Sequence, residues 1–178
     1  MASKSATYCQ IIITNPAEDA SQQWMRRAGH NGGRTLSKRI AINGFGRIGR
    51  LAMRAAQNTA GVDVVHVNEV AGDAEAAAHL LEFDSIHGRW EVPVRSAGNA
   101  MIVGGNKVSY TSNRRLEDTR WQELGIDIVL DCTGKFKTRE ALQPYLEDGV
   151  ANVVVSAPIK QDVLNVVVGV NDHLFDPR

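Results

Sequence analysis

The chain is poor in the residues that build disulfide or metal frameworks. Its 178 residues include two cysteines, Cys9 and Cys132, which are too few and too scattered for a disulfide framework or a zinc site. The five histidines show no metal-ligand spacing among themselves, so we expect no metal. This cysteine usage favours a reduced compartment, and we expect the protein in the cytoplasm.

Long apolar runs and an excess of one charge are also missing. No apolar run approaches the roughly 18 residues of a membrane span, so none is expected. Twenty Lys and Arg balance twenty Asp and Glu, which gives a formal net charge of +0. That balance provides no field for nucleic acid or a membrane surface. The length is sufficient for one domain with a real core.

The most informative motif is a short apolar run that leads into Gly-x-Gly-x-x-Gly, at residues 40–49. Gly44 permits a tight turn out of the strand, Gly46 lets the backbone approach a phosphate, and Gly49 lets a helix pack near the strand. The free N–H groups of the first helical turn, with the positive end of the helix dipole, attract a pyrophosphate. The spacing therefore indicates a dinucleotide.

The residues after the glycines support this interpretation. The strand expected from Val62 ends in Glu69, which lies 20 residues past Gly49, where a carboxylate accepts from ribose hydroxyls. A carboxylate there repels a 2′-phosphate, so NAD is favoured over NADP. The intervening residues predict a helix with a buried stripe at i, i+3, i+4 and i+7, namely Ile48, Leu51, Ala52 and Ala55.

Helix and strand patterns alternate along the rest of the chain. Continuous Val and Ile runs indicate a parallel sheet covered on both faces, and the alternation predicts a doubly wound α/β fold. We expect helices at 73–83, 116–125 and 138–149, a hairpin at 101–110 that turns at Gly104-Gly105-Asn106, and strands at 126–134, 152–156 and 164–170.

Ligands of such sheets bind at the carboxyl ends of the strands. That rule selects Asn43 to Gly46, Glu69, the turn at 132–134 and the residues from Ser156. Thr133 and Ser156 can offer hydroxyls to ribose or nicotinamide, although hydroxyls in such places also cap local turns.

Residues 1–37 differ from the remainder, which we assign to one domain at 38–178. The first 39 residues hold six Lys and Arg against two Asp and Glu and lack clear periodicity. A targeting peptide is disfavoured by Glu18 and Asp19. We expect a flexible tail, or a mis-called extension upstream of an alternative start at Leu36.

Five ordered motifs together resemble the phosphorylating glyceraldehyde-3-phosphate dehydrogenase family, over roughly residues 38–178. They begin at Ile42 (INGFGRIGR), Leu80 (LLEFDSIHGR), Cys132 (CTGKF), Ser156 (SAPIK) and Val168 (VGVNDHLFDP). The resemblance implies the amino-terminal NAD-binding domain of that family, with a Rossmann-type fold. With the glycine motif, it implies cofactor binding by Asn43, Gly44, Gly46, Arg47, Ile48, Gly49, Glu69, Arg114, Thr133, Gly134 and Ser156.

The chain departs from the family pattern in several places. The second strand ends Asn-Glu where the family usually has Asn-Asp, and the family's Glu-Arg-Asp-Pro is here Asn113-Arg-Arg-Leu. Trp90 after His-Gly-Arg resembles the pattern of the family branch found beside arsenic-resistance transporters. In that branch the acyl acceptor is thought to be arsenate.

The family's nucleophilic motif, Ser-x-x-Ser-Cys-Thr-Thr-Asn, does not occur in this sequence. We therefore expect the catalytic domain to be absent, no catalytic residue in this chain, and a truncated dehydrogenase that is inactive alone. Cys132 at the end of a buried strand is better explained as a structural thiol. Asp84 and His87 are better explained as local loop and subunit-packing groups.

Two further interpretations stay open. The chain could be part of a full oxidoreductase that oxidises an aldehyde with hydride transfer to NAD. Alternatively, it could be a non-catalytic interaction or regulatory protein that keeps the NAD fold. In that case the surface normally covered by the second domain would be apolar and exposed, which favours self-association.

Overall fold

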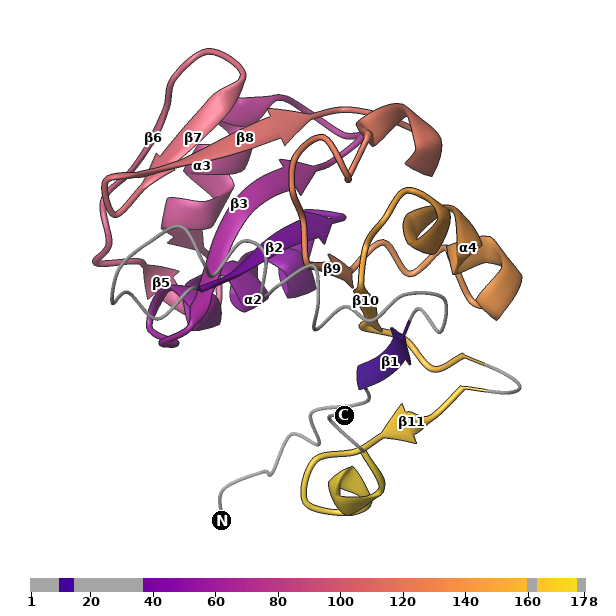
Figure 1. Cartoon of the computed structure of the whole chain (residues 1–178). Helices are drawn as coiled ribbons and strands as arrows, with labels where there is room; N and C mark the ends of the chain where they lie inside the picture. The colour runs from indigo at the N-terminus through magenta and orange to yellow at the C-terminus, as the bar shows by residue number, and fades with distance from the viewer. Residues whose placement is uncertain (1–9, 15–36, 160–162, 176–178) are drawn as a thin grey trace, which may run out of the picture.

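A nine-stranded sheet forms the centre of the molecule, and helices pack against it (Figure 1). The computed structural model describes residues 10–14, 37–159 and 163–175. The strand order is β11-β1-β10-β9-β2-β3-β8-β7-β6. The strands are β1 (Gln10–Thr14), β2 (Lys38–Asn43), β3 (Val62–Asn68), β6 (Val94–Ser96), β7 (Ala100–Val103), β8 (Asn106–Thr111), β9 (Ile128–Asp131), β10 (Asn152–Val155) and β11 (Asn165–Val166).

Three α-helices and several short elements complete the described chain. The helices are α2 (Arg47–Gln57), α3 (Ala74–Glu82) and α4 (Arg139–Glu147). The short elements are the 3-10 turns η1 (Leu116–Thr119) and η2 (Asp172–Leu174) and the small hairpin of β4 (Phe83–Asp84) and β5 (Gly88–Arg89). Among the described residues, no helix is long and apolar enough to cross a membrane.

The middle of the sheet is parallel, as the Val and Ile runs predicted. Strands β10, β9, β2, β3 and β8 pair in parallel with one another, in this order. Strands β7 and β6 extend one edge antiparallel, and β1 and β11 extend the other. The carboxyl ends of the five parallel strands therefore lie along one edge.

Helices cover both faces of this sheet. Successive residues of β2 point to opposite faces, because side chains alternate along a strand. Ala41 belongs to the core cluster that contains Leu142 of α4, whereas Ile42 belongs to the cluster that contains Met53 of α2 and Leu81 of α3. The arrangement is a Rossmann-type α/β fold, as the sequence predicted.

Local signals placed several elements correctly. The Asp73 carboxylate accepts from the Ala76 N–H at 2.9 Å and caps α3, and the Thr138 hydroxyl accepts from the Ala141 N–H at 3.3 Å and caps α4. The predicted hairpin is also present, with Gly104 and Gly105 at positive φ between β7 and β8.

The buried face of α2 differs from the predicted stripe. Gly49 and Met53 are buried, whereas Ile48, assigned to the stripe, is 52% exposed. A Cβ at Gly49 would lie 2.2 Å from the Gly44 carbonyl oxygen, so the helix touches the glycine turn at this residue. Because neighbouring residues of a helix are about 100° apart, this contact turns Ile48 outward.

Residues 116–125 do not form the predicted helix. Only the 3-10 turn Leu116–Thr119 is present, because Arg120 has a φ of 51°, in the left-handed region that ends a helical turn. Trp121 is then completely buried and donates its Nε1–H to the Leu116 carbonyl at 2.9 Å.

The strand predicted at 164–170 was also wrong in length and pairing. It is reduced to Asn165–Val166, which pairs antiparallel with β1 and not within the parallel sheet. Gly169 has a φ of 81° and turns the chain away. Val168 and Val170 consequently remain 72% and 71% exposed.

Strand β1 lies inside the segment 1–37, for which a flexible tail or a mis-called extension is predicted. Ile11 pairs with Val155 and Ile13 with Val153, antiparallel to β10. An added antiparallel strand satisfies backbone groups that the edge of the sheet would otherwise leave unpaired. Most of the segment, including Cys9 and Leu36, lies outside the described residues, so its nature stays a prediction.

Candidate functional site

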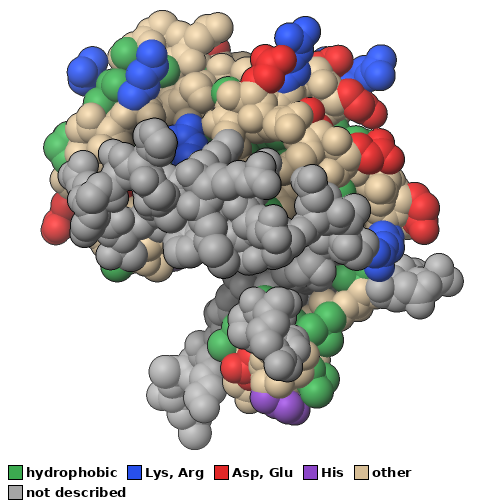
Figure 2. Space-filling model, in the orientation of Figure 1, with side chains coloured by type: hydrophobic (Ala, Val, Ile, Leu, Met, Phe, Trp, Pro, Cys, Tyr) green, Lys and Arg blue, Asp and Glu red, His purple; other side chains and the backbone are tan. Residues whose placement is uncertain are grey.

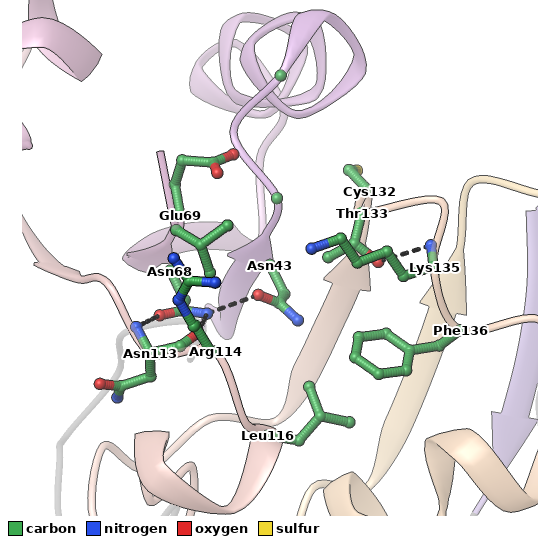
Figure 3. A pocket seen from close by; sticks show the side chains of 13 residues that line it. Asn43, Asn68, Glu69, Asn113, Arg114, Leu116, Cys132, Thr133, Lys135 and Phe136 are labelled. Atoms are coloured by element: carbon green, nitrogen blue, oxygen red, sulfur yellow. Dashed lines mark hydrogen bonds between the residues drawn. The ribbon is translucent and has the colours of Figure 1, made fainter. Parts of the chain in front are cut away.

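A hollow opens at the carboxyl ends of β2, β3 and β9 (Figure 3). The glycine turn after β2, the end of β3, the loop after β8 and the turn after β9 form its walls. The lining residues are Asn43, Gly44, Gly46, Asn68, Glu69, Val70, Asn113, Arg114, Leu116, Cys132, Thr133, Lys135 and Phe136.

Close packing explains two of the three motif glycines. Gly44 has a φ of 88°, and a Cβ there would lie 2.7 Å from the backbone of Cys132 and Thr133. Gly49 allows α2 to approach the same turn, as described above. A side chain at either position would push apart the turn, the helix and β9, so these glycines shape the site through sterics.

Gly46 meets a different requirement. A Cβ at Gly46 would find nothing within 4 Å, so the space beside this residue is open. Gly46 is also the N-cap of α2, which has no side-chain cap and no acidic residue in its first turn. No side chain of α2 itself therefore neutralises the positive end of the helix dipole, and the open space can receive an anion.

Glu69 is held rigidly at the end of β3. One carboxylate oxygen accepts from the Phe45 N–H at 2.6 Å, and the other accepts from the Ala71 N–H at 2.9 Å. The first contact ties the carboxylate to the glycine turn. Each oxygen keeps a further lone pair, so the carboxylate can still accept from hydroxyls of a ligand.

Charged side chains approach the hollow from two sides. Arg114 follows β8 and Lys135 follows β9, and the two come from opposite walls in Figure 3. The neighbouring Asn113 is fixed by its backbone N–H, which donates to Asn68 Oδ1 at 2.8 Å. The hollow therefore combines one carboxylate with two basic groups around an open centre.

The predicted cofactor residues divide into two groups. Six line the hollow: Asn43, Gly44, Gly46, Glu69, Arg114 and Thr133. The other five lie around it. Arg47 and Ile48 are exposed at the start of α2, Gly49 is buried behind the glycine turn, Gly134 has a φ of 67° beside Thr133, and Ser156 follows β10.

Seven lining residues are not among the predicted cofactor residues, although the strand-end rule had selected Cys132 within the turn at 132–134: Asn68, Val70, Asn113, Leu116, Cys132, Lys135 and Phe136. Asn68, Val70 and Lys135 directly flank residues that the strand-end rule selected, so the rule extended by one residue on each side would have found them. Asn113 is next to Arg114, which only the family resemblance implied. Leu116 and Phe136 carry no such signal, because an apolar residue after a strand more often belongs to the core.

Cys132 lines the hollow, but its thiol is not activated. Burial raises the pKa of the Cys132 thiol to about 11, although a hydrogen bond with Ser156 opposes the rise. A thiol with such a pKa is almost entirely protonated at neutral pH and is a poor nucleophile. Within the described residues, no group of three His, Cys, Asp or Glu side chains could hold a metal.

A parallel sheet, a glycine turn that opens a helix and a carboxylate at the end of the next strand define a dinucleotide-binding domain. NAD fits these residues, because Gly46 leaves room for a pyrophosphate and Glu69 faces the hollow where ribose hydroxyls would bind. Residues 38–139 match the family described as "Glyceraldehyde 3-phosphate dehydrogenase, NAD binding domain". The chain belongs to the glyceraldehyde-3-phosphate dehydrogenase family, and this part of it is an NAD-binding domain.

Three relatives illustrate the similarity. Glyceraldehyde-3-phosphate dehydrogenase 3 of Nostoc sp. is 48% identical over 143 residues, which are 80% of this chain and 42% of that protein. Glyceraldehyde-3-phosphate dehydrogenase of Geobacillus stearothermophilus is 41% identical over the same shares. The cytosolic enzyme of Trypanosoma brucei brucei is 39% identical over 77% of this chain and 41% of its own. The chain thus spans less than half the length of the curated relatives it matches.

Proposed function

We propose that this chain holds NAD for the oxidation of glyceraldehyde 3-phosphate in a dehydrogenase of this family. The observation that carries the proposal is the open space at Gly46, bounded by the uncapped start of α2 and the carboxylate of Glu69. NAD supplies the hydride acceptor of such a reaction. The chain's own residues bind and orient it.

The proposed contacts follow the geometry of the walls. The pyrophosphate lies against Gly46 and the N–H groups of Arg47 and Ile48, since these open the helix. The Glu69 carboxylate accepts from the adenosine ribose. Asn43, Arg114 and Thr133 supply further polar groups from the walls, and Gly134 and Ser156 lie next to them.

The proposal assigns the thiol chemistry of the reaction to a part of the family protein outside this chain. An aldehyde is attacked by a thiolate in such chemistry, which requires a cysteine with a lowered pKa. Cys132 does not meet this requirement, since burial raises the pKa of its thiol to about 11. The chain alone is therefore expected to bind NAD without oxidising the aldehyde.

An assay of one preparation tests both halves of this proposal. The chain is mixed with NAD, inorganic phosphate and glyceraldehyde 3-phosphate, NADH is followed by absorbance, and NAD binding is followed by calorimetry. Binding without NADH formation is the expected result. Turnover by the unaltered chain that is lost in a Cys132→Ala variant would contradict the assignment of the chemistry to another part of the protein.

A second candidate function is self-association or an interaction role in the cytoplasm. Three apolar side chains of the segment around η2 are exposed: Val168 by 72%, Val170 by 71% and Leu174 by 58%. Figure 2 shows hydrophobic side chains gathered on the lobe that carries β11 and η2. Exposed apolar surface of this kind supports binding to another protein or a second copy.

Sedimentation velocity tests this second function. Val168→Ser with Val170→Ser should reduce a discrete dimer or larger complex of the chain. Ile86→Ser is the matched control, because Ile86 is 67% exposed in the separate β4–β5 hairpin. A monodisperse monomer of the unaltered chain at all concentrations would contradict self-association.

A further inference from the structure

A buried pair of side chains lies directly behind the hollow. Asp131, the last residue of β9, and Tyr145, in α4, are both 0% exposed. The Tyr145 hydroxyl donates to Asp131 Oδ2 at 2.7 Å and accepts from the Asn43 side-chain amide. Tyr145 does not line the hollow, yet it is bonded to the ends of two strands that do.

Asp131 controls the shape of one wall. Its Oδ1 accepts from the Thr133 backbone N–H at 3.0 Å and from the Thr133 hydroxyl at 2.7 Å. The Thr133 hydroxyl in turn accepts from the Lys135 N–H at 3.1 Å. The turn after β9, which brings Thr133 and Lys135 to the hollow, is therefore folded around this one carboxylate.

Asn43 and Asn68 connect the pair to the opposite wall. The Asn68 amide nitrogen donates to Asn43 Oδ1 at 2.8 Å and to the Asn113 carbonyl at 3.0 Å. Asn68 Oδ1 accepts from the Asn113 N–H and the Thr111 hydroxyl, each at 2.8 Å. The backbone before Arg114 is thus linked, through two amides, to the hydroxyl of Tyr145.

The donors and acceptors of the network around Asp131 and Tyr145 are mutually consistent. Three groups donate to Asp131, as suits an ionised carboxylate, so the Tyr145 hydroxyl uses its proton there and must accept from Asn43. The pKa of Tyr145 is raised well above its ordinary value, because burial and the Asp131 charge disfavour a phenolate, so the hydroxyl keeps its proton. Asn43 must therefore turn its oxygen towards Asn68.

We propose that Tyr145 is a positioning residue for the cofactor: its hydroxyl holds the two walls of the hollow in the arrangement that binds NAD. This inference rests on the NAD binding proposed above. Without the hydroxyl, the Asn43 amide loses its acceptor and Asp131 loses a donor, although the ring still packs. The Asn43 side chain then relaxes. Because Asn43 lines the hollow, the loss of the hydroxyl weakens NAD binding.

Tyr145→Phe tests this proposal because it removes one oxygen and keeps the ring beside Trp121, whose centroid is 5.2 Å away. We expect a folded chain whose dissociation constant for NAD rises about tenfold, as for a hydrogen-bonded pair left unsatisfied. Calorimetric titration with NAD measures this change in the full chain.

Leu142→Ala is the matched control on the same helix. Leu142 is 0% exposed and belongs to the same core cluster as Tyr145, but no hydrogen bond joins its side chain to the hollow. The cavity should lower the urea midpoint at least as much as Tyr145→Phe does and leave NAD affinity within about twofold. Equal weakening of NAD binding by both variants would overturn the positioning role, and so would unchanged affinity in Tyr145→Phe.

Amide hydrogen exchange on the unaltered chain gives a second readout that does not depend on a variant folding. The Thr133 and Lys135 N–H groups should be protected before NAD is added, because Asp131 and Thr133 already accept them. Unprotected exchange at both amides would overturn the proposal even if Tyr145→Phe unfolds. An unaltered chain that binds no NAD would instead refute the proposed function, so the two failures are distinguishable.

Discussion

Gly46 and Gly49 belong to the same motif, but different neighbours constrain them. Gly49 is enclosed, with the Gly44 carbonyl oxygen 2.2 Å and an Ile42 methyl 3.2 Å from the place of a Cβ. Gly46 faces open space and has a φ of −68°, which any residue adopts. Gly49 therefore serves the fold, and we propose that Gly46 serves the ligand.

Alanine at each glycine should separate these two effects. Gly49→Ala should lower the free energy of unfolding by about 3 kcal/mol, because backbone must move to admit the methyl group. Gly46→Ala should change it by about 0.5 kcal/mol or less and weaken NAD binding about tenfold, because the methyl group enters the phosphate space. Urea unfolding and calorimetry measure the two quantities. A Gly46→Ala chain that binds NAD normally would contradict this assignment.

His66 is a buried titratable residue beside the same strand ends. It is 0% exposed, its ring nitrogens are hydrogen-bonded with Ser109 and Thr111, and its ring packs edge-on against Trp121. Burial lowers the pKa of His66 from 6.5 to about 4. The folded chain therefore binds fewer protons here than the unfolded chain between these two values.

Acid should destabilise the fold through this residue. The contribution of His66 is fully present above pH 6.5 and is lost as the pH falls towards 4, so a stabilisation on the order of 2 kcal/mol should disappear between pH 7 and about pH 4.5. His66→Gln should reduce the pH dependence by that amount in urea unfolding. The raised pKa of Asp131 acts in the opposite direction, but it is common to both chains and cancels in the difference. An equal dependence of the free energy of unfolding on pH in the unaltered chain and in His66→Gln would contradict the lowered pKa of His66.

At the scale of elements, the parallel strands were predictable and the edges of the sheet were not. Short apolar runs without a polar interruption mark β9 and β10, since a strand covered on both faces tolerates them. The Ile11–Ile13 run gave no such signal, because three apolar residues suit a tail as well as a strand. Strand β1 forms because β10 has an edge available for pairing, and local sequence does not reveal that edge. The same limit applies to β11, whose length is set by the turn at Gly169.

Strand β1 can be tested as a separate element. It pairs with β10, whereas the hollow lies at the ends of β2, β3 and β9. Deletion of residues 1–36 should therefore leave NAD affinity within about twofold and increase aggregation, because β10 becomes an exposed apolar edge. Calorimetry and light scattering measure these effects.

Ile12→Pro is the matched variant for this test. It removes a backbone donor from β1 without shortening the chain and should also increase aggregation. Loss of NAD binding in either chain, with the fold intact by circular dichroism, would show that β1 supports the site.

At the scale of the whole molecule, one edge of the sheet brings together lining residues that are spread over about 90 residues of the sequence, from Asn43 to Phe136. The strand-end rule correctly placed Glu69 and Thr133 at the hollow, because it depends only on topology. It could not find the bond between Asp131 and Tyr145, since that bond depends on how α4 packs and on which atoms then meet. The sequence therefore predicts which residues line the hollow better than which ones hold them in place.

The central claim is that this edge of the sheet binds NAD, and calorimetric titration of the 178-residue chain tests it most directly. We expect saturation at one NAD per chain, weaker binding of NADP because of the Glu69 carboxylate, and a marked loss of affinity in Gly46→Ala. A folded chain that takes up no NAD, or that binds NADP equally well, would contradict it.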